Sequence, residues 1–88
     1  MSITYDPVKR IANIAKHGID FADIEAVFDD PMALVIEDHD HSEQRFVVLG
    51  CDGFGRVLVV CYSLPADNVI RVISARKAQP HERRQYEE

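Results

Sequence analysis

Residues 45–63 read RFVVLGCDGFGRVLVVCYS, and this stretch decides the fold. Two runs rich in β-branched residues, Arg45 to Cys51 and Arg56 to Ser63, flank the tetrapeptide Asp52-Gly53-Phe54-Gly55. Runs of this length on either side of an aspartate–glycine turn are typical of a β-hairpin. The stretch therefore predicts two antiparallel strands joined by a tight turn.

Further strands are expected on both sides of this hairpin. Ala33 to Glu37 precedes it, and Val69 to Ala75 follows it after a turn at residues 64–68. Ile3 to Tyr5 predicts a short first strand at the start of the chain. The sequence thus predicts a short first strand and a four-stranded antiparallel sheet.

An assumed register that pairs Cys51 with Arg56 sorts the strand residues into two faces. The face expected to meet the helices is apolar: Phe46, Val48, Val59, Cys61, Ile70 and Val72. The other face is expected to be open and partly polar: Arg45, Val47, Leu49, Leu58, Val60, Tyr62, Arg71 and Ile73. The same register separates the two cysteines by about 17 Å, too far for a disulfide, so both are expected to be reduced.

Two helices are predicted between the first strand and the sheet. Asp6 is a suitable N-cap, Pro7 suits the first helical position, and Gly18 suits a left-handed C-cap. Apolar residues recur at helical spacing between these caps: Val8, Ile11, Ala12 and Ala15. Asp20 begins a second helix, which ends before Pro31 and has the predicted buried face Phe21, Ile24, Val27 and Phe28. The two helices are expected to form a helical hairpin.

A short C-terminal helix is predicted to begin at Pro80, and it is too polar to be stable without tertiary contacts. Its start, Ala78-Gln79-Pro80, has no serine or threonine at the N-cap, so we expect a weak cap. The resulting fold class is α+β, with helices gathered on one face of the sheet.

Length and composition limit the class of protein. The 88 residues are enough for one domain, residues 1–88, and hydrophobic residues make up 47% of a globular composition. No apolar run approaches the roughly 20 residues of a membrane span, and no signal segment opens the chain. We therefore expect a cytoplasmic protein without a membrane partner.

The charge is unevenly distributed along the chain. The net charge is −5, which by itself argues against a nucleic-acid partner. Ten acidic and three basic residues give −7 over residues 1–44, whereas seven basic and five acidic residues give +2 over residues 45–88. A local field of this kind attracts phosphate even on an acidic protein, although arginines that merely solubilise the surface would give the same pattern.

Several motifs together resemble one protein family. Residues 70–78 read IRVISARKA and residues 82–86 read ERRQY, and residues 6–21 read DPVKRIANIAKHGIDF. With the VFDDP of residues 27–31 and the pair Glu43 and Arg45, their order and spacing resemble the BrnT toxins of bacteria over nearly the whole chain.

This resemblance implies a RelE-like fold and metal-independent cleavage of RNA, with no cofactor. It also implies a BrnA-type antitoxin that dimerises, binds operator DNA and carries two toxin chains. The toxin is then expected to meet operator DNA only through the antitoxin complex, with which it represses its own operon. Its substrate is expected to be mRNA, so that cleavage inhibits translation.

The chemistry of RNA cleavage selects the candidate residues. Arginine's planar fork matches phosphate oxygens, and histidine is the side chain that ordinarily titrates near neutral pH. The candidate catalytic residues are therefore His17, Arg71, Arg76, Arg83 and Arg84. The candidate RNA-binding residues are Lys16, Lys77, His81 and Tyr86.

Each assignment has an alternative. His17 would equally serve as a cap on the helix dipole, Arg83 and Arg84 would equally contact the antitoxin, and Lys9 and Asn13 are interpreted as solvated. His39 and His41 alternate on an extended segment, but a solvated strand end is favoured over a metal site because no third ligand accompanies them. A ParE-like toxin that poisons gyrase, or an antitoxin-binding module without catalysis, is the alternative function.

Overall fold

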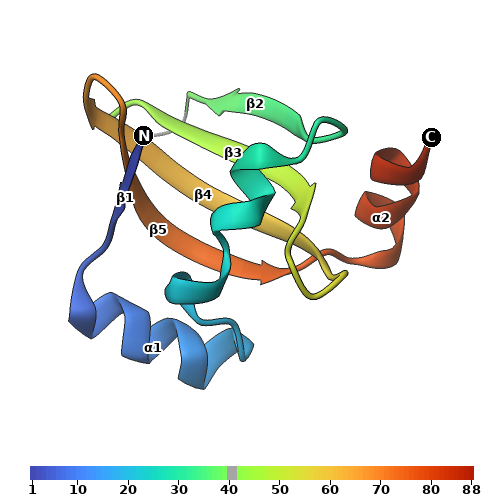
Figure 1. Cartoon of the computed structure of the whole chain (residues 1–88), viewed down its shortest axis with the longest axis horizontal. Helices are drawn as coiled ribbons and strands as arrows, with labels where there is room; N and C mark the ends of the chain where they lie inside the picture. Colours follow the sequence, from blue (N-terminus) through green and yellow to red (C-terminus); the bar gives the residue numbers. More distant parts are fainter. Residues whose placement is uncertain (40–41) are drawn as a thin grey trace.

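The computed structural model describes residues 1–39 and 42–88. It has the predicted α+β class, with helical segments on one side of a sheet and the C-terminal helix beyond its end (Figure 1). In chain order the elements are β1 (Ser2–Thr4), α1 (Pro7–His17), η1 (Phe21–Asp23), η2 (Glu25–Asp29), β2 (Leu34–Asp38), β3 (Arg45–Cys51), β4 (Val57–Ala66), β5 (Val69–Lys77) and α2 (Pro80–Glu87).

The sheet has five strands in the order β1-β5-β4-β3-β2, one more than predicted. The first strand joins the sheet and pairs parallel with β5, whereas the other pairs are antiparallel. The prediction of a purely antiparallel four-stranded sheet was therefore wrong. The edge of β5 has free backbone groups, and β1 pairs with them: the Ser2 amide donates to the Asn68 carbonyl at 2.7 Å.

The predicted register of the central hairpin was wrong by one residue. Cys51 pairs with Val57 rather than Arg56, because the carboxylate of Asp52 holds a longer turn. That carboxylate accepts the backbone N–H groups of Phe54 and Arg56 and pairs with the Arg56 guanidinium. Gly55 completes the turn at a φ of 79°, which favours glycine.

The shift exchanges the two faces of β4. Leu58, Val60 and Tyr62 lie in the core, whereas Val59 and Cys61 belong to the face opposite the helices. The assignment of β3 and β5 holds, since Val48, Ile70 and Val72 are buried and Phe46 packs against them. Both cysteines are free thiols, as expected.

The second predicted helix is instead two short 3-10 helices, η1 and η2, so the helical hairpin was a wrong prediction. The apolar residues that bind this segment to the sheet are Phe21, Ile24 and Val27, and each is at most 2% exposed. Their spacing of three residues fits the 3-10 helix, in which side chains at i and i+3 eclipse. A 3-10 path therefore buries all three on one side.

Helix α1 has the predicted caps, but its orientation is unexpected. An apolar stripe ordinarily packs on the core, and here it does not. Asp6 accepts the Val8 amide, and Gly18 ends the helix at a φ of 72°. In α1 only Asn13 is buried, whereas Val8 and Ile11 are 73% and 69% exposed. The apolar stripe therefore faces solvent, and the polar Asn13 faces the sheet.

Asn13 attaches α1 to the edge of β5 beyond β1. Its side-chain N–H groups donate to the carbonyls of Ile19 and Ala75 at 2.8 Å each, and its oxygen accepts the Ala75 amide at 3.1 Å. The side chain thus replaces the missing neighbouring strand at this point. Asn13 is not solvated, contrary to the interpretation from sequence.

Candidate functional site

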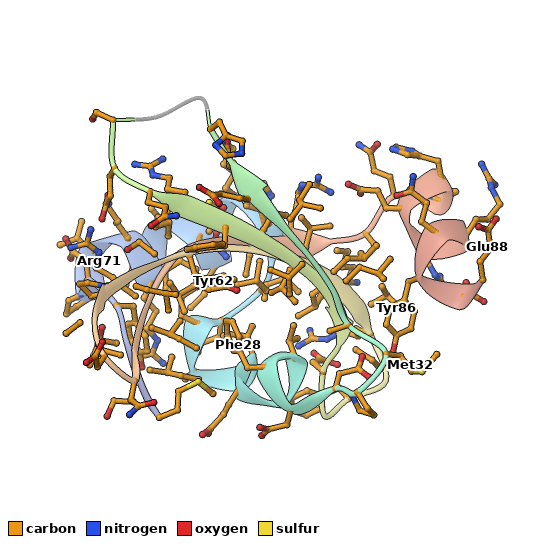
Figure 2. All side chains as sticks on the ribbon, turned by 90° about the horizontal axis from the view of Figure 1, so that it is seen from above. Phe28, Met32, Tyr62, Arg71, Tyr86 and Glu88 are labelled. Atoms are coloured by element: carbon orange, nitrogen blue, oxygen red, sulfur yellow. The ribbon has the colours of Figure 1, made fainter. Side chains whose placement is uncertain are left out.

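The candidate residues do not converge on one point but lie in separate groups around the sheet. Figure 2 places Arg71 and Tyr86 at opposite ends of the molecule. Arg71 lies near the start of β5, and Arg76 and Lys77 lie at its end. His17 and Lys16 end α1 beside the middle of the same strand, at Ile73 and Ser74.

The group around His17 forms a hollow of about 270 Å³ between α1 and β5, which we call the α1–β5 hollow. Its lining combines two ammonium groups, an imidazole, a hydroxyl and an amide with two apolar side chains: Lys9, Ala12, Asn13, Lys16, His17, Ile73 and Ser74. Within the part of the chain that the structure describes, Lys9, Lys16 and His17 form no ion pair or side-chain hydrogen bond. Their polar atoms are therefore available to a ligand.

Two local features of the backbone shape this hollow. Gly18 ends α1 in the left-handed conformation, so His17 and Lys16 stand in the last turn, directly before the chain reverses. In β5 the pairing shifts, because Cys61 faces Ser74 but Tyr62 faces Val72. Ile73 is thus an extra residue, and a bulge of this kind redirects the neighbouring side chains.

Arg71 belongs to a second group, at the start of β5. It pairs with Glu43, whose other oxygen lies 3.9 Å from Nε of Arg45. Ser63 lies between the two arginines in the register, opposite each of them. The Ser63 hydroxyl and Nε of Arg45 are buried without a hydrogen-bond partner among the described residues.

This second group extends what the sequence could identify. Only Arg71 was selected there as a site residue, and Glu43 and Arg45 were noted only for the family resemblance. The signal available in the sequence was the spacing of Glu43 and Arg45, which are two positions apart in the chain. Nothing in the sequence places Ser63 between them, because that depends on the register of three strands.

Arg76 is bound by a carboxylate rather than left free. Its two terminal nitrogens donate to the two oxygens of Glu82 at 2.8 and 2.9 Å, a bidentate pair. Glu82 also accepts the Gln79 amide and so completes the helix start that lacks a serine or threonine cap. The Arg76 guanidinium lowers the pKa of Glu82 to about 2. Arg76 therefore holds α2 in place.

Tyr86 provides the other attachment of α2. Its hydroxyl donates to Asp30, and Figure 2 shows its side chain reaching from α2 toward the segment after η2. Asp30 also accepts the backbone amides of Met32 and Cys51. The hydrogen bond that the Tyr86 hydroxyl donates to Asp30 raises the pKa of Tyr86 to about 12.

The remaining candidates lie around the outer side of α2. Lys77 and Arg83 line a hollow of about 230 Å³ together with Arg56, so three cations surround it. Arg83 also lies 3.9 Å from Glu87, and Arg56 is already bound by Asp52. His81 and Arg84 are exposed on α2 outside this hollow.

We expect α2 to detach from the sheet at both extremes of pH. The pKa of Glu82 is about 2 instead of 4.5, so its contribution is complete above pH 4.5 and is lost between pH 4.5 and 2. The pKa of Tyr86 is raised from 10 to about 12, so its contribution is lost as the pH rises from 10 to 12. NMR resonances of α2 should shift toward random-coil values in these two ranges.

The variant Glu82→Gln should lose the acid transition, because no carboxylate is left to titrate against Arg76. Glu87→Gln is the matched control, since the Glu87 side chain is 61% exposed. If α2 resonances of the wild type stay unchanged from pH 7 to 2, the contact of Glu82 with Arg76 does not hold the helix.

No metal centre is defined by the described residues. Among them, no group of three histidine, cysteine, aspartate or glutamate side chains is placed to hold a metal ion. His39 lies 3.6 Å from Glu37, and His41 lies outside the described residues. In the described part of the chain, no helix is long and apolar enough to span a membrane.

Comparison with known proteins places the chain among ribonuclease toxins. The profile of the family described as "Ribonuclease toxin, BrnT, of type II toxin-antitoxin system" matches residues 5–82. The chain is similar to the crystal structure of the ribonuclease toxin BrnT of Brucella abortus, with 30% identity and a TM-score of 0.72. The match covers 90% of this chain and 97% of that one. A sequence search of curated proteins found no match.

The fold and these matches define a ribonuclease toxin of a type II toxin–antitoxin system. The chain belongs to the BrnT family. Membership implies RNA as the substrate and an antitoxin as the partner.

Proposed function

We propose that this chain is a metal-independent endoribonuclease that cleaves mRNA at the α1–β5 hollow and so inhibits translation. The observation that carries the proposal is the convergence of Lys9, Lys16 and His17 on one hollow beside Ser74. Cleavage without a metal needs a group that moves protons and cations that stabilise charge on phosphorus. This hollow offers both.

The chemistry follows from these groups. His17 takes the proton from the ribose 2′-hydroxyl, and the 2′-oxygen attacks the adjacent phosphorus. The bond from phosphorus to the 5′-oxygen breaks, that oxygen takes up a proton from water, and the protonated His17 returns its proton to the solvent. Lys9 and Lys16 stabilise the negative charge that gathers on the phosphate oxygens. The products are a 2′,3′-cyclic phosphate and a 5′-hydroxyl.

The ends of β5 guide the RNA strand on either side of the hollow. Arg71, Ser74 and Arg76 face Ser63, Cys61 and Val59 in the register, so they lie on the open face of the sheet. Arg71 and Arg76 are about 16 Å apart along the strand, which spans more than one nucleotide. The side chain of Arg71 is half-exposed, so it can leave Glu43 and bind a phosphate of the RNA instead. Arg76 has a different role, because its pair with Glu82 positions α2.

A group of basic side chains continues past the end of β5. It consists of Lys77, Arg83 and the exposed residues Arg84 and His81. In the proposal they bind phosphates further along the RNA, so they affect affinity more than the rate of the chemical step. A BrnA-type antitoxin neutralises the toxin in the cytoplasm, and the complex of both represses their operon.

The test is cleavage of an RNA by the purified protein in the presence of EDTA, beside Lys16→Ala and Arg83→Ala. We expect the wild type to cleave. Lys16→Ala should lower the rate at saturating RNA about 100-fold, because it removes charge stabilisation at the reacting phosphate. Arg83→Ala should mainly raise the RNA concentration needed.

Where the purified wild type is inactive, the same assay in a translation extract separates two cases. Cleavage of mRNA there would establish a ribosome-dependent nuclease. Arrest of cell growth without cleavage in either assay would favour a ParE-like toxin, and absence of toxicity would favour a binding module.

A further inference from the structure

Helix α1 presents its apolar side to solvent. Val8, Ile11, Ala12 and Ala15 are all exposed, and we call these four residues the α1 stripe. At 100° per residue they lie within one sector of the helix, opposite the buried Asn13. Figure 1 shows α1 at the margin of the molecule, with no other described element on its outer side.

This orientation leaves apolar surface of α1 in contact with water. Burial of a valine or isoleucine side chain stabilises a folded protein, and here Val8 and Ile11 forgo most of that stabilisation. The sheet contact of α1 is made by Asn13 through hydrogen bonds, so the stripe is not needed to hold the helix. An apolar stripe that the fold leaves uncovered is typical of an interaction surface.

The charges beside the stripe indicate the chemistry of the partner. Lys9 and Lys16 border the stripe on the side of the α1–β5 hollow, seven residues apart and so about 10 Å along the helix. Neither forms an ion pair within residues 1–39 and 42–88. The opposite border is formed by the apolar Ile14, and Arg10, on the far side of the helix, is already paired with Asp20 at 2.7 Å. The unsatisfied charge therefore lies on one side and is positive.

A symmetric dimer in which two α1 stripes pack on each other does not fit that description. Pro7–His17 contains no acidic residue, so a second α1 stripe packed on the first offers no carboxylate to Lys9 and Lys16. An amphipathic helix with an apolar face and acidic residues two turns apart along one border satisfies both the stripe and the lysines.

We propose that the α1 stripe binds such a helix of the antitoxin. The inference rests on the proposed function, because it takes the inhibited site to be the α1–β5 hollow. Lys9, Ala12 and Lys16 belong to the hollow as well as to the stripe or its border. A helix bound to the stripe therefore covers the hollow, and its acidic residues pair with Lys9 and Lys16. RNA is then excluded from the hollow, which explains the inhibition.

The experiment measures binding of the purified chain to the antitoxin of its own toxin–antitoxin system. The double variant Val8→Gln/Ile11→Gln keeps helix-forming side chains at two exposed positions, so its fold should be unchanged. We expect it to bind about 100-fold more weakly. Ile36→Glu is the matched control, since Ile36 is 66% exposed on β2, and its affinity should change less than about threefold.

Charge gives a second readout. Ile11→Glu should weaken binding more than Ile11→Lys, because the partner helix is acidic, and wild-type affinity should fall with salt. Both variants should cleave RNA like the wild type when the antitoxin is absent. A wild-type protein that binds the antitoxin but cleaves no RNA would therefore overturn the proposed function and not this surface.

Three results would overturn the inference. One is wild-type affinity in Val8→Gln/Ile11→Gln, and another is weaker binding in Ile36→Glu than in Ile11→Glu. The third is a dimer of the free wild type that becomes a monomer in the double variant, since the stripe would then bind a second copy.

Discussion

Replacement of Asn13 by alanine is expected to lower the free energy of unfolding by about 3–4 kcal/mol. The side chain makes three hydrogen bonds, and its removal leaves the amide and carbonyl of Ala75 without partners in a buried place. Each unsatisfied buried group costs about 1–3 kcal/mol. A domain of this size is stable by only about 5–10 kcal/mol, so the variant should be close to unfolding at 37 °C.

Denaturant unfolding monitored by circular dichroism measures this change. Lys9→Ala is the matched control on the same helix, because Lys9 is exposed, and its effect should stay within about 0.5 kcal/mol. A loss of less than 1 kcal/mol in Asn13→Ala would show that α1 is held by other contacts.

The second large effect is on catalysis. We expect His17→Ala to lower the rate of RNA cleavage about 100- to 1000-fold, the usual contribution of a positioned acid–base group. The unfolding free energy should change by at most about 1 kcal/mol, because the side chain makes no hydrogen bond to the rest of the described structure.

His39→Ala is the matched control for this experiment. His39 is exposed at the end of β2 and touches none of the residues of the hollow, so its loss should leave the rate unchanged. If His17→Ala lowers stability slightly and leaves cleavage intact, His17 is only a cap on the helix dipole. That outcome would move the proton transfer to another group.

The sequence identified the elements whose signals are local. The caps of α1, Asp6 and Gly18, are formed by side-chain and backbone chemistry within a few residues, and the structure confirms them. The bounds of β3 and the start of α2 at Pro80 are also as predicted. These features depend on the residue itself and its nearest neighbours.

The errors arose where a distant or uncommon contact decided the outcome. The register of β4 depends on one carboxylate, that of Asp52, which captures an additional residue in the turn. The parallel pairing of β1 joins Ser2 to Val69, two residues that are far apart in the sequence. Local pattern does not encode either contact.

The orientation of α1 is the most instructive difference. A helix with an apolar stripe is ordinarily placed with that stripe on the core. Here the edge of β5 requires hydrogen-bond partners more than apolar contact, and Asn13 supplies them on the opposite side of the helix. The reversal frees the stripe and turns Lys9 and Lys16 toward the hollow.

The site was predictable only in part for the same reason. His17 and Lys16 were selected from their chemistry, and the structure places them in one hollow. Ser74 could not be selected, because its position beside His17 depends on how α1 meets the bulge in β5. The bidentate pair of Arg76 with Glu82 likewise depends on the turn between β5 and α2.

The measurement that tests the central claim most directly is the chemical identity of the RNA ends after cleavage in EDTA. Wild-type protein, with ribosomes added if they are required, should leave a 2′,3′-cyclic phosphate on one fragment and a 5′-hydroxyl on the other. Those ends require attack by the neighbouring 2′-oxygen, the reaction that the α1–β5 hollow is equipped to support. Fragments with 5′-phosphate ends would contradict the account, because the attacking oxygen would then come from water.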